Sequence, residues 1–279
     1  MKLHNLIYAA FVFASAFSIA ACNDISEDDR FIYVKPADVK KCVLIEDFTA
    51  QRCSNCPNAA AAIESMQAAH TADTVIAVGL YCGDLGKAPN GTPFPLYNET
   101  ANWYYEQRGE PLQPAAMIDR QVISENPNTW ATYVENRISQ DPLLQLKAVC
   151  DYDESSRTVD ITVDAEGLAS VEGNLQVWLV EDGIVGVQYM PDGSVNQNYV
   201  HNHVFRETVN DRMGDPITLI TGGTETRTFS YKLDDGWVAE NMWVVAFVYN
   251  DDGVQQAVRA SVIPTQEDGA TEGGTETAE

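Results

Sequence analysis

The sequence predicts two fold classes in one chain, an α/β part followed by an all-β part. Between about residues 31 and 141, apolar strand-like runs alternate with helix-like segments. From Asp141 onward, strand-like runs recur between turn signals with no convincing helix between them. Alternating strands and helices are typical of a parallel sheet covered by helices, whereas many short strands separated by turns are typical of a β-sandwich. We therefore expect two domains, at 31–141 and 142–264.

The α/β part begins with two apolar runs, 43–48 and 74–81, which suit strands that are buried on both faces of a parallel sheet. The alanine-rich segment 58–69 between them predicts a helix, because Ile63 and Met66 fall on one helical face. The remaining segments are a loop rich in glycine and proline at 83–98, a helix at 99–108, a strand at 115–118 and a helix at 128–140.

The all-β part consists of strand-like runs separated by Asp-Gly and Gly-Gly turn signals. These runs are 143–152, 158–164, 175–181, 199–206, 226–233, 243–249 and 254–262. Roughly seven short strands with regular turns predict two packed sheets. The last residues, 265–279, are mainly Thr, Glu and Gly with little to bury, and we expect a disordered acidic tail.

The first residues predict an exported lipoprotein. Lys2 is followed by an apolar run that ends in Ser-Ile-Ala-Ala, directly before Cys22. This pattern is typical of a signal peptide, here 1–21, and the cysteine after it resembles the lipobox, in which the thiol takes lipid before cleavage. An ordinary signal peptide followed by a chance cysteine is the alternative. Several acyl chains on Cys22 would anchor the chain stably through an acidic tether at 22–30.

Charge and cysteine count narrow the function classes. The chain has 17 basic and 41 acidic residues and a formal net charge of −24, which argues against nucleic acid as a partner. Six cysteines are present, and in an oxidising compartment disulfides persist. With Cys22 lipidated the number left is odd, so one thiol is unpaired or the pairing is dynamic. We expect no cofactor.

Cys53-Ser54-Asn55-Cys56 is the most informative motif of the mature chain. It follows a predicted buried strand and precedes a predicted helix, with Pro57 in the first helical turn, where proline is tolerated. Cys53 is thereby placed at a helix N-terminus, whose free N–H groups and dipole favour a thiolate, and Arg52 adds positive charge. A stabilised thiolate attacks a disulfide and also leaves one readily.

This segment resembles the active-site turn of the thioredoxin superfamily. The resemblance implies that Cys53 is the attacking thiol and Cys56 the resolving thiol. It also implies that Asp47 is the buried acid that takes the proton of Cys56, and that Pro114 is the cis-proline on which substrate backbone lies. One departure is Arg52, which stands where the family usually has tryptophan.

Three alternatives to catalysis stay open. The Cys53–Cys56 pair can be a closed disulfide that only ties a turn. It can also be half of a zinc site completed by Cys82 and by His70 or a more distant residue, although the sequence has no second CxxC motif; we expect no metal. Asp47 can be an ordinary buried polar residue whose hydrogen bonds are satisfied.

The other cysteines carry two more predictions. Cys82 follows the second apolar run, so it is expected at the same sheet edge as Cys53 and within reach of exchange with it. Cys42 begins its strand and is expected at the opposite end. There it can meet Cys150, on the first strand of the all-β part, and a Cys42–Cys150 disulfide would link the two domains.

His201 and His203 stand at i and i+2 in the run 199–206, so their side chains are expected on one strand face. Such a pair could suit a metal ion. Because no carboxylate or cysteine cluster accompanies it, we favour polar positions on an exposed face.

The lipobox, the segment 46–57 and the run 199–206 together resemble the Omp28-related outer-membrane lipoprotein family of Gram-negative anaerobes. The resemblance implies a thioredoxin-like domain joined to an immunoglobulin-like β-sandwich. It also implies an outer-membrane location, on the periplasmic or the cell-surface face, and the acidic residues 27–29 resemble a surface-export signal. It supplies no defined activity.

Two functions are compatible with these observations. The first is thiol–disulfide exchange on extracytoplasmic proteins through Cys53 and Cys56, by an oxidoreductase or isomerase. The second is non-catalytic binding or adhesion at the surface, with the thioredoxin-like domain as a scaffold. The expected partners are the membrane, through lipid on Cys22, and either protein thiols and disulfides or a surface protein ligand.

Overall fold

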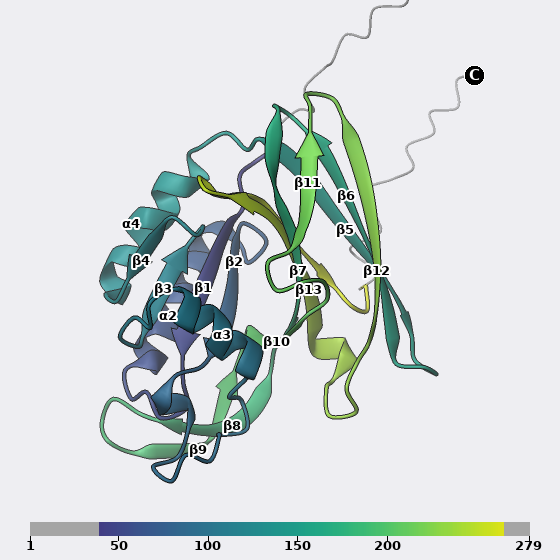
Figure 1. Cartoon of the computed structure of the whole chain (residues 1–279). Coiled ribbons are helices and arrows are strands. Elements are labelled where there is room, and N and C mark those ends of the chain that lie inside the picture. The colour runs from purple at the N-terminus through teal and green to yellow at the C-terminus, as the bar shows by residue number, and fades with distance from the viewer. Residues whose placement is uncertain (1–38, 265–279) are drawn as a thin grey trace, which may run out of the picture. The chain divides into compact units, whose positions relative to one another are not determined.

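The computed structural model of the chain describes residues 39–264 (Figure 1). The predicted signal peptide, the lipid attachment at Cys22, the tether and the acidic tail lie outside the described residues. They stay predictions.

Helices and strands divide the described chain much as the sequence predicts. The helices are α2 (Cys56–His70), the 3₁₀ turn η2 (Asp84–Gly86), α3 (Glu99–Gln107), α4 (Pro127–Ile138) and the 3₁₀ turn η3 (Ala239–Asn241). The strands are β1 (Val43–Thr49), β2 (Val75–Tyr81), β3 (Ala115–Ile118), β4 (Val122–Ser124), β5 (Leu144–Asp153), β6 (Thr158–Gly167), β7 (Val171–Glu181), β8 (Ile184–Tyr189), β9 (Val195–His201), β10 (Val204–Thr208), β11 (Asp215–Leu219), β12 (Thr224–Lys232), β13 (Met242–Asn250) and β14 (Gly253–Ser261). An α/β segment followed by a β-rich segment is thus confirmed.

One nine-stranded sheet takes strands from both segments. Its order is β14-β13-β7-β10-β2-β1-β3-β4, and β11 also pairs with β7. β1 and β2 run parallel, β3 is antiparallel to β1, and β10 joins the free edge of β2 where Val204 lies opposite Gly79. The sheet therefore combines strands from before and after residue 141. The division into two domains at that residue stays a prediction.

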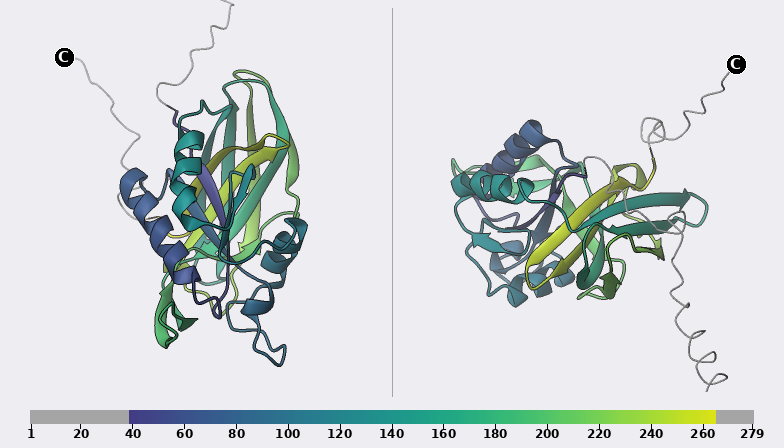
Figure 2. Two further views of the ribbon diagram at one scale, coloured as in Figure 1. Left: turned by 90° about the vertical axis from the view of Figure 1, so that its left-hand side faces the viewer. Right: turned by 90° about the horizontal axis from the view of Figure 1, so that it is seen from above.

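Helices cover both faces of β1 and β2, which explains why every residue of these two strands is buried. α2 and α4 pack on one face through residues such as Ile63 and Trp130. α3 packs on the other face through Tyr104, which meets Trp178 of β7. Figure 2 shows α2 and α4 side by side, with α3 apart from them.

The β-rich segment encloses a separate apolar core. A three-stranded sheet, β12-β6-β5, packs against β7, β11 and β13 of the large sheet. The alternating burial of β5 and β6 supplies inward residues such as Val159, Ile161 and Cys150. Two packed sheets fit the predicted sandwich architecture at this coarse level.

The predicted strand at 199–206 is wrong at its centre. β9 ends at His201 and β10 begins at Val204, because His203 adopts a left-handed backbone (φ 58°) that breaks the extended run. Asp182 fixes this break, since its Oδ1 accepts a hydrogen bond from His203 N (2.6 Å). The two histidines therefore do not share one strand face.

Candidate functional site

The Cys53–Cys56 turn lies between buried β1 and helix α2. Cys53 N donates to Ala50 O (3.1 Å) and Cys56 N donates to Cys53 O (3.2 Å), so the chain turns tightly before the helix begins. A disulfide joins Cys53 to Cys56. Pro57 occupies the first turn of α2, where a missing N–H removes no helical hydrogen bond.

The N-terminus of α2 keeps its positive electrostatic character. Its N-cap residue, Asn55, makes no side-chain capping bond, and the first turn holds no acidic residue. Arg52 serves a different purpose from the expected one, because its Nη1 donates to Lys87 O (2.6 Å) and thereby ties the turn to the following loop. The helix dipole, more than Arg52, is thus the feature that favours a thiolate here.

Asp47 lies on β1, buried beneath the turn. Its Oδ1 has no hydrogen-bond partner in the described part of the chain. Burial raises the pKa of Asp47 to about 7, since the charged form loses its hydration. Asp47 therefore lacks the partner that an ordinary buried polar residue has.

Asp47 and Cys56 both line a small cavity of about 40 Å³. His201, from the end of β9, and Tyr81, from the end of β2, also line it. Tyr81 Oη and His201 Nδ1 are hydrogen-bonded at 2.8 Å. Burial lowers the pKa of His201 to about 4, against a smaller opposing effect of the Val187 backbone, so the imidazole is neutral at pH 7.

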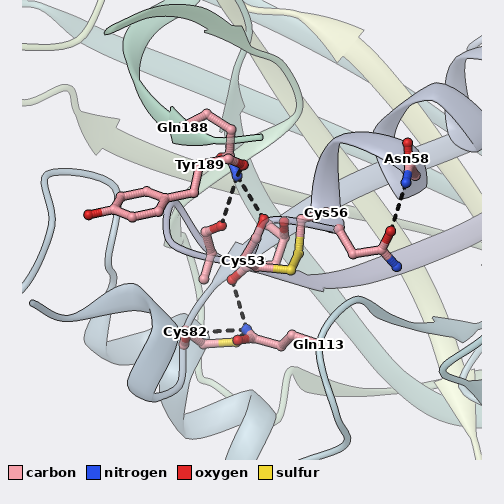
Figure 3. The surroundings of a disulfide bond; sticks show 10 residues. Cys53, Cys56, Asn58, Cys82, Gln113, Gln188 and Tyr189 are labelled. Atoms are coloured by element: carbon pink, nitrogen blue, oxygen red, sulfur yellow. Dashed lines mark hydrogen bonds between the residues drawn. A yellow bond between two sulfur atoms is a disulfide. The ribbon is translucent and has the colours of Figure 1, made fainter. Parts of the chain in front are cut away.

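The β8–β9 hairpin (184–201) covers the disulfide turn (Figure 3). Gln188 Nε2 donates to Cys53 O (2.9 Å) and, more weakly, to Ala50 O (3.4 Å). Gln51 also links the turn to the hairpin. Its side-chain Nε2 donates to Val187 O (2.9 Å), and its backbone carbonyl accepts from Tyr189 N (2.9 Å). Under this cover Cys53 is only 3% exposed and Cys56 4%.

Sequence reasoning missed this hairpin. Its turn was visible as Asp192-Gly193, but the flanking segments 184–189 and 195–201 lack the apolar alternation of a strand on a core. The cross-strand pairs of β8 and β9 face solvent on one side, with Val185 opposite Val200. A turn signal with a possible strand on each side was the available indication.

Pro114 is buried at the start of β3, and the Gln113–Pro114 peptide bond is cis. Gln113 links the ends of three strands at this point. Its Nε2 donates to Thr49 O (2.9 Å) and Cys82 O (3.1 Å), and it lies 3.3 Å from Cys82 Sγ. In the view of Figure 3, Gln113 and Gln188 lie on opposite sides of the disulfide.

The remaining described cysteines are free thiols. Cys82 lies at the predicted end of the sheet, but it packs into the core on the α3 face, and burial raises its pKa well above the usual range. Cys42 and Cys150 are not joined, so the predicted Cys42–Cys150 disulfide is not formed in the structure. The reason is packing, because Cys150 faces the core between β5, β6 and β7, whereas Cys42 packs against the core around α3.

The alternative zinc site is not assembled. His70 Nε2 contacts Glu135 Oε1 (2.5 Å) at the outer side of α2 and α4. His203 Nδ1 pairs with Asp182 Oδ1 (3.1 Å). Within residues 39–264, no group of three or more His, Cys, Asp and Glu side chains is arranged to hold a metal ion.

Comparison with known proteins identifies relatives of the chain. The profile of the family described as "Outer membrane protein Omp28" matches residues 101–266, which is more than half of the chain and begins after the disulfide turn. A comparison with curated proteins finds no match. In the described residues, no helix has the length and apolar character needed to cross a membrane.

Two solved structures from Porphyromonas gingivalis resemble the chain. HBP35 is 17% identical and has a TM-score of 0.60, over 88% of this chain and 81% of that chain. A domain of the outer membrane lipoprotein Omp28 is 23% identical and covers 44% of this chain and 90% of that chain, with a TM-score of 0.32. The first of these likenesses shows a shared fold.

Proposed function

The chain belongs to the outer membrane protein Omp28 family, and from this premise we propose that it is a lipid-anchored thiol–disulfide exchange protein. The family places the protein at the outer membrane. The lipobox at Cys22 supports anchoring through acyl chains on that residue. The exchange chemistry is assigned to Cys53 and Cys56.

The arrangement around β1 supports a thioredoxin-like interpretation of the α/β segment. A parallel β1–α2–β2 unit is followed by the antiparallel pair β3 and β4 and by α4. The disulfide at the start of α2, the buried Asp47 and the cis peptide bond before Pro114 support this interpretation. The two packed sheets of the β-rich segment support an immunoglobulin-like interpretation in the same way.

The observation that carries the proposal is the cavity shared by Asp47 and Cys56. A general base is effective when its pKa lies near the working pH, and burial places the pKa of Asp47 at about 7. The unpartnered Oδ1 is free to accept a proton. A carboxylate with these properties beside the second cysteine of a CxxC pair suits proton removal from that cysteine.

The exchange balances as follows. The Cys53 thiolate attacks a substrate disulfide, and one substrate sulfur leaves as a thiolate that takes a proton from water. Cys56 gives its proton to Asp47 and its thiolate attacks Cys53 Sγ, which releases the second substrate sulfur. The substrate has gained two electrons and Cys53–Cys56 is a disulfide again. A dithiol reductant must then reduce it, and the reverse sequence oxidises a substrate dithiol.

Surface binding or adhesion is the second candidate. The observation that favours it is the cover over the disulfide, because Gln188 bonds to the Cys53 carbonyl and leaves both cysteines almost fully buried. In that case the disulfide ties the turn, and the α/β segment is a scaffold for partner recognition.

Reduction of insulin by a dithiol tests the exchange proposal. We expect the protein to accelerate insulin precipitation, Cys53→Ala to abolish the acceleration, and Cys56→Ala to accumulate a mixed disulfide with substrate. Cys150→Ala is the matched control, because Cys150 is a buried free thiol in the other core. If the wild-type protein is no faster than Cys53→Ala, the proposal is wrong and the binding function is favoured.

A further inference from the structure

The Cys53–Cys56 disulfide is closed off from any reactant that could exchange with it. Cys53 is only 3% exposed and Cys56 only 4%, whereas exchange requires a thiolate to reach one of the two sulfurs directly. Leu85 packs against the small apolar cluster of these cysteines, and the β8–β9 hairpin contacts the turn through Gln188 (Figure 3). A covering segment must therefore move before the disulfide can react.

The distal part of the hairpin, residues 187–197, makes few apolar contacts with the rest of the molecule. In the described chain, β8 and β9 pair only with each other. Within 187–197, Gln188 is the only buried residue, and the side chains of Tyr189 and Val195 are 37% and 42% exposed. Movement of this segment therefore exposes little apolar surface, and such segments open at a low cost in free energy.

Hydrogen bonds between uncharged groups hold this segment on the disulfide turn. Gln188 Nε2 donates to Cys53 O (2.9 Å). Gln51 Nε2 donates to Val187 O (2.9 Å), and Tyr189 N donates to Gln51 O (2.9 Å). Because water can replace each partner when the segment lifts, the net stabilisation of the closed arrangement by these bonds is small.

The base of the hairpin is held in a different way. Ile184 packs against a buried apolar cluster that includes Tyr81. His201, which lies opposite Ile184, is hydrogen-bonded through Nδ1 to Tyr81 Oη (2.8 Å). Between this base and the distal part, the pairing register shifts from Gly186 to Gln188, as in a β-bulge. A bulge interrupts the ladder and bends the strand, and glycine has the widest backbone freedom, so these features indicate a hinge at Gly186.

We propose that residues 187–197 form a lid over Cys53–Cys56, held closed by Gln188 and Gln51 and hinged at Gly186, and that this lid must open before a substrate sulfur can reach the disulfide. The lid adds regulation to the proposed exchange site, and its use in catalysis rests on that proposed function. Opening itself does not, because it controls the access of any thiol or phosphine to the disulfide.

Global unfolding and displacement of Leu85 are the competing routes to the disulfide. Global unfolding exposes the whole core, so reduction by that route accelerates steeply with urea, whereas lid opening exposes little surface and depends little on urea. Leu85 lies in η2 and is fastened to the turn, because Arg52 N donates to Leu85 O (3.2 Å). Leu85→Ala loosens this second cover without touching the lid.

Reduction of the oxidised protein by a small phosphine tests the proposal. The phosphine attacks one sulfur, the other sulfur leaves as a thiolate, and water then gives two thiols and the phosphine oxide. Gln188→Ala should make this reduction roughly fivefold to tenfold faster, because one bond that closes the lid is lost. Gln197→Ala is the matched control, since Gln197 is exposed on the lid.

A variant at the hinge should have the opposite effect. Gly186→Ala restricts the backbone of the open lid, so reduction should become roughly twofold to fivefold slower. The closed lid can accept this change, because the added Cβ would stand 3.4 Å from the His201 ring, an ordinary contact distance.

Hydrogen exchange of the Tyr189 N–H is an independent measure of opening, since opening breaks its bond to Gln51 O. Both the exchange rate and the reduction rate are proportional to the open fraction. Gln188→Ala should therefore raise the two rates by the same factor. Faster reduction without faster exchange at Tyr189 would overturn the lid, because the substitution would then act only at the Cys53 carbonyl.

The remaining outcomes separate the lid from its alternatives and from the exchange function. Reduction that accelerates steeply with urea, or that Leu85→Ala accelerates more than Gln188→Ala does, overturns the lid, whatever the insulin assay shows. The expected rates in a protein that is inactive toward insulin support the lid and remove the exchange function. If Gly186→Ala does not fold, the reduction and exchange rates of Gln188→Ala decide, and two unchanged rates overturn the lid.

Discussion

A buried aspartate lies near each end of β1, and the two are held in opposite ways. Near the N-terminal end, Asp119 Oδ1 accepts from Leu44 N (2.8 Å), and its Oδ2 contacts Lys41 Nζ (2.7 Å) and Arg137 Nε (2.9 Å). Near the C-terminal end, Asp47 Oδ1 has no partner among the described groups. One carboxylate is thus paired with two cations, whereas the other has an oxygen without a partner.

The difference follows from what each end of the strand joins. Arg137 also donates from Nη2 to Val254 O (3.0 Å), so the Asp119 cluster fastens α4 and β14 to the central strands. The described residues that line the cavity beside Asp47 include Cys56, Glu64 and two tyrosines, but no Lys or Arg. A fixed ion pair holds a junction together, whereas an isolated buried acid costs stability, which makes Asp47 a candidate functional residue.

The largest expected effect is at Asp119, near the N-terminal end of β1. Asp119→Asn keeps the shape and a side-chain oxygen but leaves the buried Lys41 and the partly buried Arg137 without a carboxylate partner. Removing one partner from a buried ion pair typically costs about 3–5 kcal/mol. We expect a loss of this size in the free energy of urea unfolding. A loss below about 1 kcal/mol would mean that the cluster contributes no more than an exposed pair.

A smaller effect is expected where the β8–β9 hairpin covers the Cys53–Cys56 turn. Gln188→Ala removes the hydrogen bond to the Cys53 carbonyl. Because a typical hydrogen bond contributes about 1 kcal/mol, reduction of the Cys53–Cys56 disulfide by a small phosphine should become roughly fivefold to tenfold faster. Gln197→Ala is the control, since Gln197 is exposed on the same hairpin. Equal rates for both variants would show that Gln188 does not limit access to the disulfide.

Local signals predicted much of the fold and part of the site. β1 and β2 are buried on both faces, and the uninterrupted runs of mainly apolar residues in the sequence indicate this directly. The CxxC turn was recognisable from its place between an apolar run and a helical segment, whereas the roles of Asp47 and Pro114 were implied only by the thioredoxin-superfamily resemblance. The sequence also indicated where the helices stop and the β-rich segment begins.

Contacts between distant segments could not be predicted. His201 lines the same cavity as Asp47, and it is brought there by the pairing of β10 with the edge of β2, which has no local sequence signal. The break at His203 depends on Asp182, which lies in the connection between β7 and β8. The Cys42–Cys150 prediction failed for the same reason, since which core a strand residue faces depends on the partner sheet.

The pH dependence of stability tests most directly the central claim that Asp47 is a protonatable acid and not a structural carboxylate. Because burial raises its pKa to about 7 in the native state, the native protein holds a proton that the unfolded chain, with a pKa near 4, releases. Its contribution to stability is complete below about pH 4 and is lost as the pH rises through about 7.

Urea unfolding of wild type and Asp47→Asn between pH 4 and 8 measures this contribution. The unfolding free energy of Asp47→Asn minus that of wild type should increase by several kcal/mol, on the order of 4, as the pH rises. Asp119→Asn should show no gain of this kind. Parallel stability curves for wild type and Asp47→Asn over the whole range would contradict the account.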